Sequence, residues 1–340
     1  MTNILFTCAG RRNYLLQYFK EAMNSRGRII AADMQITAPA MAIADKAILV
    51  PPVDADNYIN IILDICRSEK IDAIFSLNDL ELPVLSVAKS SFESLGVKVV
   101  ISNAKAIDIC FDKWQTITFE KVFGFNYPQT FINLQEAQKA IEDGSLSFPL
   151  VVKPRWGSAS IGLEFPENRR ELELAYELLS LRLFRSSLAE VSRQDEAHAI
   201  LIQQKIEGIE YGMDVLNDFT GKPQQVYVKE KLAMRAGETD KSVLRNKPEI
   251  EAIGYKIGEA LEHIGNLDCD IFEKDGKFFL IEMNPRFGGG YPFTHMSGAN
   301  YPEALIAWIN GLSYDFKNFK KNYNQVYAKC DYLIPVKSEL

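Results

Sequence analysis

Short apolar runs alternate with amphipathic stretches from residue 1 to about residue 105. The runs NILFTCAG, RGRIIAADM, KAILV, DAIFSL and VKVVIS predict strands, and the stretches at 12–25, 56–69 and 80–95 have the spacing of helices. Alternation of this kind is typical of a parallel sheet covered by helices on both faces. We therefore expect an α/β unit with a doubly wound parallel sheet at the start of the chain.

The pattern changes from about residue 111. FDKWQTITFEKVFGFNYPQTFI predicts a helix followed by a strand, and SFPLVVKPRWGSASIGLEF predicts a hairpin with small residues at its tip. A helix-rich stretch at 167–195 precedes several longer strands, which indicates an α+β region. We expect three units, at 1–110, at 111–205 (central part about 118–203) and at 206–340.

Composition and charge narrow the class of protein. With 47% hydrophobic and 24% charged residues the chain has the composition of a globular protein. Its net charge of −7 argues against non-specific binding of nucleic acid. No apolar run approaches the roughly 18 residues of a membrane span, and the N-terminus does not resemble a signal peptide, so we expect a cytoplasmic protein without membrane contact. Five scattered cysteines and three distant histidines show no metal-ligand spacing.

The first strand ends in a way that partly resembles a dinucleotide-binding turn. Gly10 follows the strand, and Asp33 lies near the position of a ribose-binding acid. The other glycines of the fingerprint are absent, because Arg11, Arg12 and Asn13 come next. This disfavours a dehydrogenase. Arg11 and Arg12 either hold an anionic group of a substrate or are solvated.

The segment FLIEMNPRFGGG, residues 279–290, places three polar side chains at the end of a strand. Side chains alternate faces, so Glu282, Asn284 and Arg286 point one way and Met283 points into the core. Carboxylate and amide oxygens suit Mg²⁺, and a guanidinium suits phosphate or carboxylate. A salt-bridge cluster beside a flexible loop is the alternative.

A second polar segment, KPRWGSASIGL, follows an apolar strand. Lys153 ends the strand, and the small residues after it let backbone N–H groups approach phosphate oxygens. The order differs from that of a P-loop, because the lysine precedes the glycines. A plain hairpin tip is the alternative. The candidate loop residues are Gly157, Ser158, Ser160 and Gly162.

Taken in order, these segments resemble the ATP-grasp superfamily over essentially the whole chain. They are most similar to the carbamoyl-phosphate-synthase-like, single-unit carboxylate–amine ligases. The resemblance implies an N-terminal pre-ATP-grasp domain and a two-lobed ATP-grasp module, with ATP between two antiparallel sheets. The segments that carry it are FDKW, KPRWGSASIGL, LIQQKIEGIEYGMDV and IEMNPR.

The resemblance also implies roles for individual residues. Lys113 and Lys153 are the nucleotide lysines, and the loop at 156–162 closes over the triphosphate. The adenine edge meets Gln203, Gln204 and Ile206, and the ribose meets Glu210. Mg²⁺, as one or two ions that Mn²⁺ can replace, is held by Asp270, Glu282 and Asn284. Arg286 steadies the γ-phosphate or the acyl phosphate. Two positions depart from the family pattern: Gln203 stands where glutamate is usual, and Asp270 stands where synthase relatives often have glutamine.

Two further groups are candidates for substrate binding. Arg235 could grip a carboxylate or phosphates, with Lys229 and Lys231 as lesser candidates; a solvated polar loop is the alternative. The segment 286–300 follows the metal strand and should contact substrate, although a single His295 is more often structural. The substrate candidates are Arg286, Gly288, Gly289, Gly290, His295 and Ser297.

The expected function is an ATP-dependent ligase that activates a carboxylate as an acyl phosphate and joins it to an amine. The expected partners are small-molecule substrates, and a homodimer is open. The alternatives are carboxyphosphate or carbamoyl phosphate formation and a nucleotide-binding module without turnover.

The metal site also constrains the hairpin CDIFEKDGKFFLIEMN. A two-residue Asp275-Gly276 turn would put Asp270 opposite Ile281, on the wrong face for sharing a metal with Glu282. A loop with an odd number of residues, or a bulge in one strand, is needed to bring the two carboxylates to one face. We predict a three-residue loop at 274–276, with Asp270 and Glu282 on one face.

Overall fold

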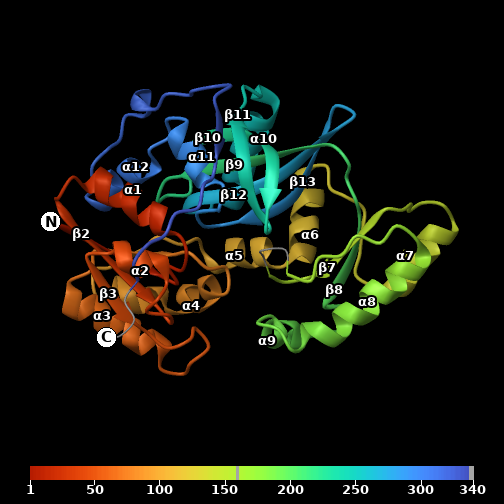
Figure 1. The fold of residues 1–340 in the computed structure, drawn as a ribbon, viewed down its shortest axis with the longest axis horizontal. Coiled ribbons are helices and arrows are strands. Elements are labelled where there is room, and N and C mark those ends of the chain that lie inside the picture. Colours follow the sequence, from red (N-terminus) through yellow and green to blue (C-terminus); the bar gives the residue numbers. More distant parts are fainter. Residues whose placement is uncertain (158–160, 337–340) are drawn as a thin grey trace.

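The computed structural model describes residues 1–157 and 161–336. Its strands form three sheets: a five-stranded sheet at the N-terminus, a three-stranded sheet in a projecting lobe and a six-stranded sheet in the C-terminal part. Figure 1 shows the projecting lobe, with α7 and α8, set apart from the other two sheets. The parallel sheet followed by two antiparallel sheets confirms the predicted fold class.

The N-terminal sheet is parallel throughout, with the strand order β3-β2-β1-β4-β5. In β1, Ile4 and Phe6 pack into one apolar cluster and Leu5 into another, because neighbouring side chains take opposite faces. Helices α1 and α2 cover the first face, and α3 and α4 cover the second. The elements are β1 (Thr2–Thr7), α1 (Asn13–Met23), β2 (Gly27–Asp33), α2 (Pro39–Ile43), β3 (Lys46–Leu49), α3 (Tyr58–Glu69), β4 (Ala73–Ser76), α4 (Glu81–Glu93) and β5 (Lys98–Val99).

The turn after β1 is held by a buried acid. Asp33, at the end of β2, accepts a hydrogen bond from the backbone N–H of Gly10 at 2.8 Å. Asp33 thus stabilises the β1–α1 turn. The strand order reverses between β1 and β4, so the carboxyl ends of these two strands flank the crevice where doubly wound sheets bind ligands.

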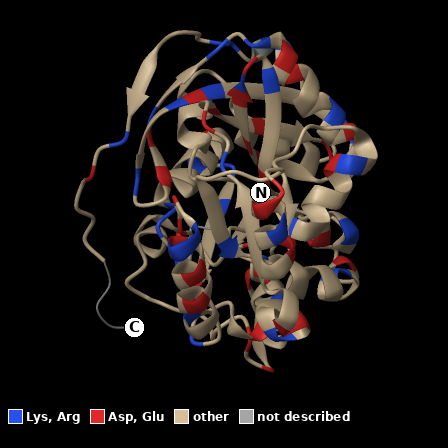
Figure 2. Cartoon of the chain, turned by 90° about the vertical axis from the view of Figure 1, so that its right-hand side faces the viewer, with Lys and Arg blue, Asp and Glu red and all other residues tan. Residues whose placement is uncertain are grey.

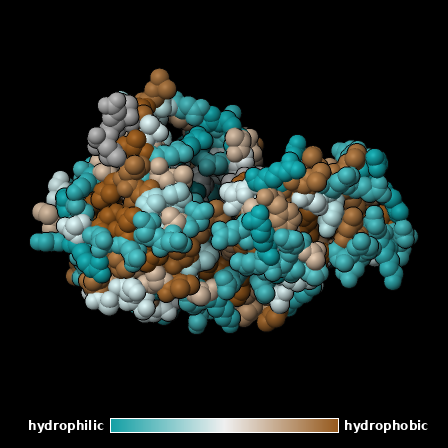
Figure 3. Space-filling view, turned by 90° about the horizontal axis from the view of Figure 1, so that it is seen from below, coloured by the Kyte–Doolittle hydropathy of each residue, from teal (hydrophilic) through white to brown (hydrophobic). Residues whose placement is uncertain are grey.

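Helices α5 (Ala104–Phe111) and α6 (Lys113–Phe123) lead into the projecting lobe, which we call the lid lobe. Its sheet has the order β6-β8-β7. Val152 and Glu164 exchange backbone hydrogen bonds of 2.9 Å, so the chain returns antiparallel to β7 as the sequence predicts. Hydrophilic side chains cover much of the lobe's surface seen from below (Figure 3). The elements are β6 (Thr130–Phe131), α7 (Leu134–Glu142), β7 (Leu150–Pro154), α8 (Arg169–Leu183), α9 (Ala189–Ser192), a 3₁₀ turn (Arg193–His198) and β8 (Ile200–Gln204).

The C-terminal sheet is antiparallel, with the order β13-β12-β9-β10-β11-β14. Residues 205–208, which we call the hinge, connect β8 of the lid lobe to β9 of this sheet. Tyr291 and Tyr301 share a core with Phe6 and Phe19, so the C-terminal part packs on the N-terminal sheet. The elements are β9 (Ile209–Asn217), β10 (Pro223–Arg235), β11 (Glu238–Leu244), α10 (Pro248–Leu261), β12 (Gly265–Lys274), β13 (Lys277–Asn284), α11 (Tyr291–Met296), α12 (Tyr301–Ile309), a 3₁₀ turn (Phe316–Asn318) and β14 (Val326–Ala328).

Residues of both charge signs are mixed along the chain in Figure 2, and the segment after β14 runs along one side of the molecule. Among the described residues, none of the helices is long and apolar enough to cross a membrane. The expected cytoplasmic localisation stays a prediction.

Candidate active site

One cavity of about 730 Å³ is lined by residues of the lid-lobe and C-terminal sheets and by residues that follow strands of the N-terminal sheet. Lys153 comes from the lid lobe, Glu210 and Glu282 come from the C-terminal sheet, and Leu77 follows the end of β4 in the N-terminal sheet. Segments far apart in sequence therefore border one space.

The two predicted nucleotide lysines lie at the same end of this cavity. Lys113 Nζ is 3.6 Å from a carboxylate oxygen of Glu282, and it donates to the backbone carbonyl of Gly157. Lys153 Nζ donates to the side-chain carbonyl of Gln203 at 2.8 Å. The amide of Gln203 in turn donates to the Thr130 hydroxyl at 2.8 Å. Gln203 thus holds Lys153 without supplying a negative charge.

The environment of Lys153 lowers the pKa of its ammonium group. The side chain is only 7% exposed. Burial, and then the charge of Lys113, lower the pKa of Lys153 to about 8, while Glu282 and Glu120 act in the opposite sense. A polyanion in the cavity would stabilise the charged form of both lysines.

The adenine and ribose candidates also line the cavity. Gln203, Gln204 and Ile206 come from the end of β8 and the hinge, beside apolar Val151 and Phe165. An apolar slot bordered by backbone polar groups suits a planar base. The Glu210 carboxylate forms an ion pair with Lys231, whose Nζ lies 2.7 Å away.

The hairpin of β12 and β13 has the predicted facing but not the predicted loop. Lys274 pairs with Lys277 across a two-residue turn, in which Asp275 and Gly276 both have positive φ. The three-residue loop is therefore wrong: the type I′ turn matches the twist of the strands, and Asp275-Gly276 suits it. A bulge at Ile281 corrects the register instead, so Asp270 lies opposite Glu282. The two carboxylates share a face, as predicted.

Asp268, which the sequence did not single out, lies opposite Asn284 and lines the same cavity. Burial, and then the charges of Asp270 and Asp214, raise the pKa of Asp268 to about 6. The pKa of Asp270 is also raised, by burial first, although Lys231 lies 2.6 Å away and opposes the shift. The alternation Asp268–Asp270 in β12 was the available signal.

These residues fit a divalent cation in their chemistry. They provide carboxylate and amide oxygens, and the pKa of Asp268 is raised by burial and then by neighbouring negative charge, which a cation would offset. No cluster of three or more His, Cys, Asp or Glu side chains in the described part of the chain forms a metal site by itself. A Mg²⁺ ion held here would take further ligands from phosphate oxygens, which is its usual behaviour.

Arg286 is buried between two acids. Its guanidinium is 2.7 Å from Asp79 of the N-terminal domain and 3.6 Å from Asp268. Its Nε is buried and has no hydrogen-bond partner among the described residues. Arg286 lines the cavity, so its guanidinium can meet a phosphoryl or carboxylate oxygen there. Sequence reasoning missed Asp79, whose signal was its place just after the buried strand β4.

The glycines after β13 leave room for neighbouring side chains. A Cβ added at Gly288 would lie 2.1 Å from the Asp268 carboxyl, and one at Gly290 would lie 2.8 Å from Lys229 Cε. Gly289 and Gly290 line the cavity, while Gly288 makes space for Asp268 behind it.

His295 and Ser297 are not among the cavity-lining residues. The His295 ring stacks on Tyr18 with centroids 3.8 Å apart, and burial lowers its pKa to about 4. The Ser297 hydroxyl donates to the Phe293 carbonyl at 2.7 Å. The structure thus corrects their prediction as substrate contacts, because α11 turns both side chains toward packing.

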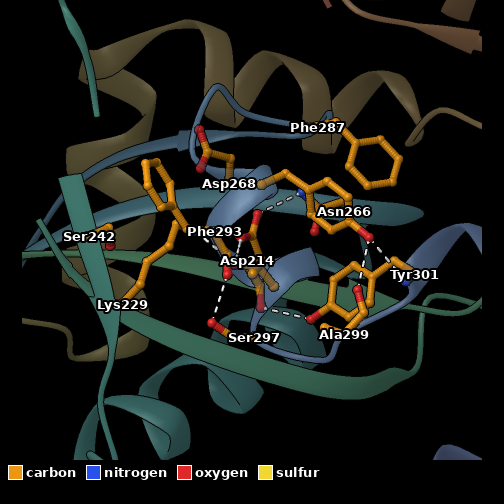
Figure 4. Close-up of polar contacts among 12 residues, drawn as sticks. Asp214, Lys229, Ser242, Asn266, Asp268, Phe287, Phe293, Ser297, Ala299 and Tyr301 are labelled. Carbon is orange, nitrogen blue, oxygen red and sulfur yellow. Dashed lines mark hydrogen bonds and ion pairs between the residues drawn. The ribbon is translucent and has the colours of Figure 1, made fainter. Parts of the chain in front are cut away.

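Figure 4 shows a buried network behind the glycine turn. Asp214 forms an ion pair with Lys229 and accepts hydrogen bonds from the Thr294 hydroxyl and, at 3.0 Å, from the Asn266 amide. Tyr301 donates to the backbone carbonyl of Asp214 at 3.2 Å. Lys229 borders the cavity, but its charge is already matched by Asp214.

Arg235 is not brought into the cavity. It is half exposed and pairs with Asp240 at 2.8 Å and with Asp331. The structure therefore contradicts Arg235 as a direct contact, because these two acids hold its guanidinium. Its neighbour Met234 lines the cavity.

Part of the predicted phosphate loop can be placed. Gly157 lines the cavity, with φ of 105°. Gly162 is not among the lining residues, although its neighbours Ile161 and Leu163 are. Ser158 and Ser160 lie outside the described residues.

Comparison with known proteins agrees with this architecture. A PylC-like N-terminal domain family matches residues 4–100, and an ATP-grasp domain family matches residues 146–294. The chain therefore carries an ATP-grasp domain. The matched ATP-grasp stretch contains Lys153, Glu210, Asp270, Glu282 and Arg286.

Individual relatives share the ATP-grasp fold at low identity. The carbamoyl phosphate synthase large chain of Thermotoga petrophila is 24% identical over 276 residues, covering 73% of this chain and 23% of that protein. The D-alanine–D-alanine ligase of Pseudothermotoga lettingae is 28% identical over 253 residues, covering 69% of this chain and 77% of that protein. A biotin carboxylase structure from Campylobacter jejuni has a TM-score of 0.73 at 16% identity and covers 94% of this chain and 73% of that one. This chain therefore spans less than a quarter of the length of its synthase relatives.

Proposed function

We propose that this protein is an ATP-dependent ligase that joins a carboxylate to an amine. The observation that carries the proposal is the meeting of Lys113, Lys153, Arg286 and the facing pair Asp270–Glu282 around one cavity. Cations and oxygen ligands of this kind serve phosphoryl transfer, in which positioning and charge stabilisation do most of the work.

The proposed reaction has two steps. A carboxylate oxygen of the substrate takes the γ-phosphoryl group of ATP, which gives an acyl phosphate and ADP. The amine then attacks the acyl carbon, phosphate leaves with the bonding electrons, and the amine loses a proton as the amide forms. The proposed partners are thus two small molecules, a carboxylate and an amine.

The side chains divide this work between them. Lys113 and Lys153 would hold the triphosphate, and Glu210 would bind the ribose. Mg²⁺ bound by Asp270, Glu282 and Asn284 would offset the phosphate charge. Arg286, held by Asp79 and Asp268, would meet the charge that develops on the transferred group.

A second candidate is carboxyphosphate formation from bicarbonate, which the likeness to a carbamoyl phosphate synthase favours. The ligase reading is preferred because the D-alanine–D-alanine ligase alignment covers 77% of that protein, whereas the synthase alignment covers 23%. A nucleotide-binding module without turnover is the third candidate.

ADP release by the purified protein separates the three. The assay pairs a panel of amino acids and other carboxylates with and without amine partners, and a parallel series contains bicarbonate alone. The ligase requires ADP release that depends on an organic carboxylate and yields an amide by mass spectrometry. Release with bicarbonate alone supports the second candidate. Nucleotide binding without any release supports the third.

A further inference from the structure

The cavity extends beyond the phosphate end to the crevice of the parallel sheet. Cys8 and Arg12 follow β1, and Leu77, Asn78 and Asp79 follow β4; all five line the cavity. These are the two strands between which the order of the sheet reverses. Ligands of open α/β sheets bind at this place, so the crevice and the nucleotide site form one continuous space.

Charge at the crevice end is nearly balanced by pairs within the protein. Arg286 has Asp79 and Asp268, and Lys229 has Asp214. At the nucleotide end, Lys113 and Lys231 also have carboxylates within 4 Å. Each of these cations therefore already has a carboxylate partner within the protein.

Arg12 differs from them. Among the described residues, no Asp or Glu lies within 4.0 Å of its guanidinium, and its one hydrogen bond is a long contact of 3.4 Å to the Tyr14 hydroxyl. The nearby acid Glu238 is already bonded to Lys329 at 2.9 Å. Arg12, Glu238 and Arg286 all line the cavity, so these groups border one space.

A structural role for the Arg12 side chain is not evident. Arg12 is the residue before α1, and its side chain makes no capping hydrogen bond to that helix. Arg12 is half-buried and lines the cavity. Because no carboxylate of the described residues lies within 4.0 Å of its guanidinium, its bidentate donors are available to a ligand.

We propose that Arg12 binds a carboxylate or phosphate group of the ligase substrate, one that is not itself changed in the reaction. The inference rests on the proposed ligase function and narrows its substrate class. At least one of the two substrates carries a second anionic group, as an amino acid or a dicarboxylate does. That group lies at the switch-point crevice, while the reacting carboxylate faces Arg286.

The test uses Arg12→Ala, Arg12→Lys and a matched control, Arg11→Ala. Arg11 is the exposed neighbour with the same charge, and it does not line the cavity. Calorimetry in the presence of ADP and Mg²⁺ measures binding without turnover. The probes are the twenty L-amino acids, succinate, glutarate and phosphoserine, each amino acid paired with its carboxamide, and the two dicarboxylates with their monoamides.

For the probe that binds wild type best, we expect Arg12→Ala to weaken binding by about tenfold or more, the usual loss for a hydrogen bond to a charged group. Arg12→Lys should recover part of it, Arg11→Ala should bind like wild type, and nucleotide affinity should be unchanged. An amide that lacks the second anionic group should bind wild type and Arg12→Ala equally. The separate carboxylate and phosphate probes identify the anion.

Three results would overturn the proposal. The probe could bind Arg12→Ala within twofold of its affinity for Arg11→Ala. The amide could lose as much affinity as the acid when Arg12 is replaced by alanine. The wild type could bind none of the probes. Failure of the ligase function is recognised separately, as the absence of carboxylate-dependent ADP release in wild type.

Discussion

Replacing Gln203 by glutamate should change the pH range in which the protein binds ATP. In the wild type the only side chain hydrogen-bonded to Lys153 Nζ within the described residues is the neutral amide of Gln203, at 2.8 Å, and the pKa of Lys153 is lowered to about 8. Bound triphosphate would keep Lys153 protonated. Above pH 8 the free protein must therefore take up a proton on binding, and the apparent Kd should rise by up to about tenfold per pH unit.

The magnitude of the change follows from the distance. A carboxylate about 3 to 4 Å from an ammonium interacts by about 4 to 6 kcal/mol at an effective dielectric constant of about 20. This corresponds to about three or four pKa units, from which the desolvation of the new carboxylate is subtracted. The pKa of Lys153 in Gln203→Glu should thus return above about 10, and the alkaline loss of ATP affinity should shift upward by at least about 1.5 pH units.

Binding of a non-hydrolysable ATP analogue, measured by calorimetry from pH 6.5 to 9.5, tests this expectation. Gln204→Glu is the control, because Gln204 also lines the cavity but its side chain accepts from the Gln129 backbone and not from Lys153. If Gln203→Glu and wild type lose affinity over the same pH range, the assignment of the low pKa to Lys153 is refuted.

Four other predictions use the same site. Lys153→Ala should weaken Mg²⁺-dependent ATP binding markedly, and unchanged affinity by calorimetry would remove Lys153 from the site. Arg286→Lys should stay folded but lose turnover by about 100-fold, because a point charge cannot reproduce the guanidinium fork; near-normal turnover at saturating substrate would make Arg286 structural. Gly288→Ala should lower the free energy of unfolding by about 1–3 kcal/mol, since its Cβ would meet the Asp268 carboxyl at 2.1 Å. Gly289→Ala, with a contact of 3.1 Å to Glu238, should lower the melting temperature less, and equal losses for the two variants would contradict this. Residues 154–163 should gain protection from hydrogen exchange when the ATP analogue binds, and no gain would argue against a closing lid.

The sequence alone determined the features that depend on local periodicity. Alternation along β13 placed Glu282 and Asn284 on one face and Met283 in the core, where the structure has it fully buried. The strand–helix alternation predicted the parallel sheet, and the polar segments in their order predicted the ATP-grasp family. The first two depend on residues within a few positions of one another. The family prediction needs several such local segments in one order along the chain, which can also be read without the fold.

The tertiary structure decided what depends on distant segments. The requirement that Asp270 face Glu282 was visible in the sequence, but a loop and a bulge satisfy it equally, and the bulge at Ile281 was chosen because the Asp275-Gly276 turn fits the strand twist. The pairing of Arg286 with Asp79 joins residues 207 positions apart. Stacking of His295 on Tyr18 and pairing of Arg235 with Asp331 removed two candidates from the cavity in the same way. A side chain's charge is fixed by its type, but whether that charge is available to a ligand depends on which acids the fold brings within a few ångströms of it.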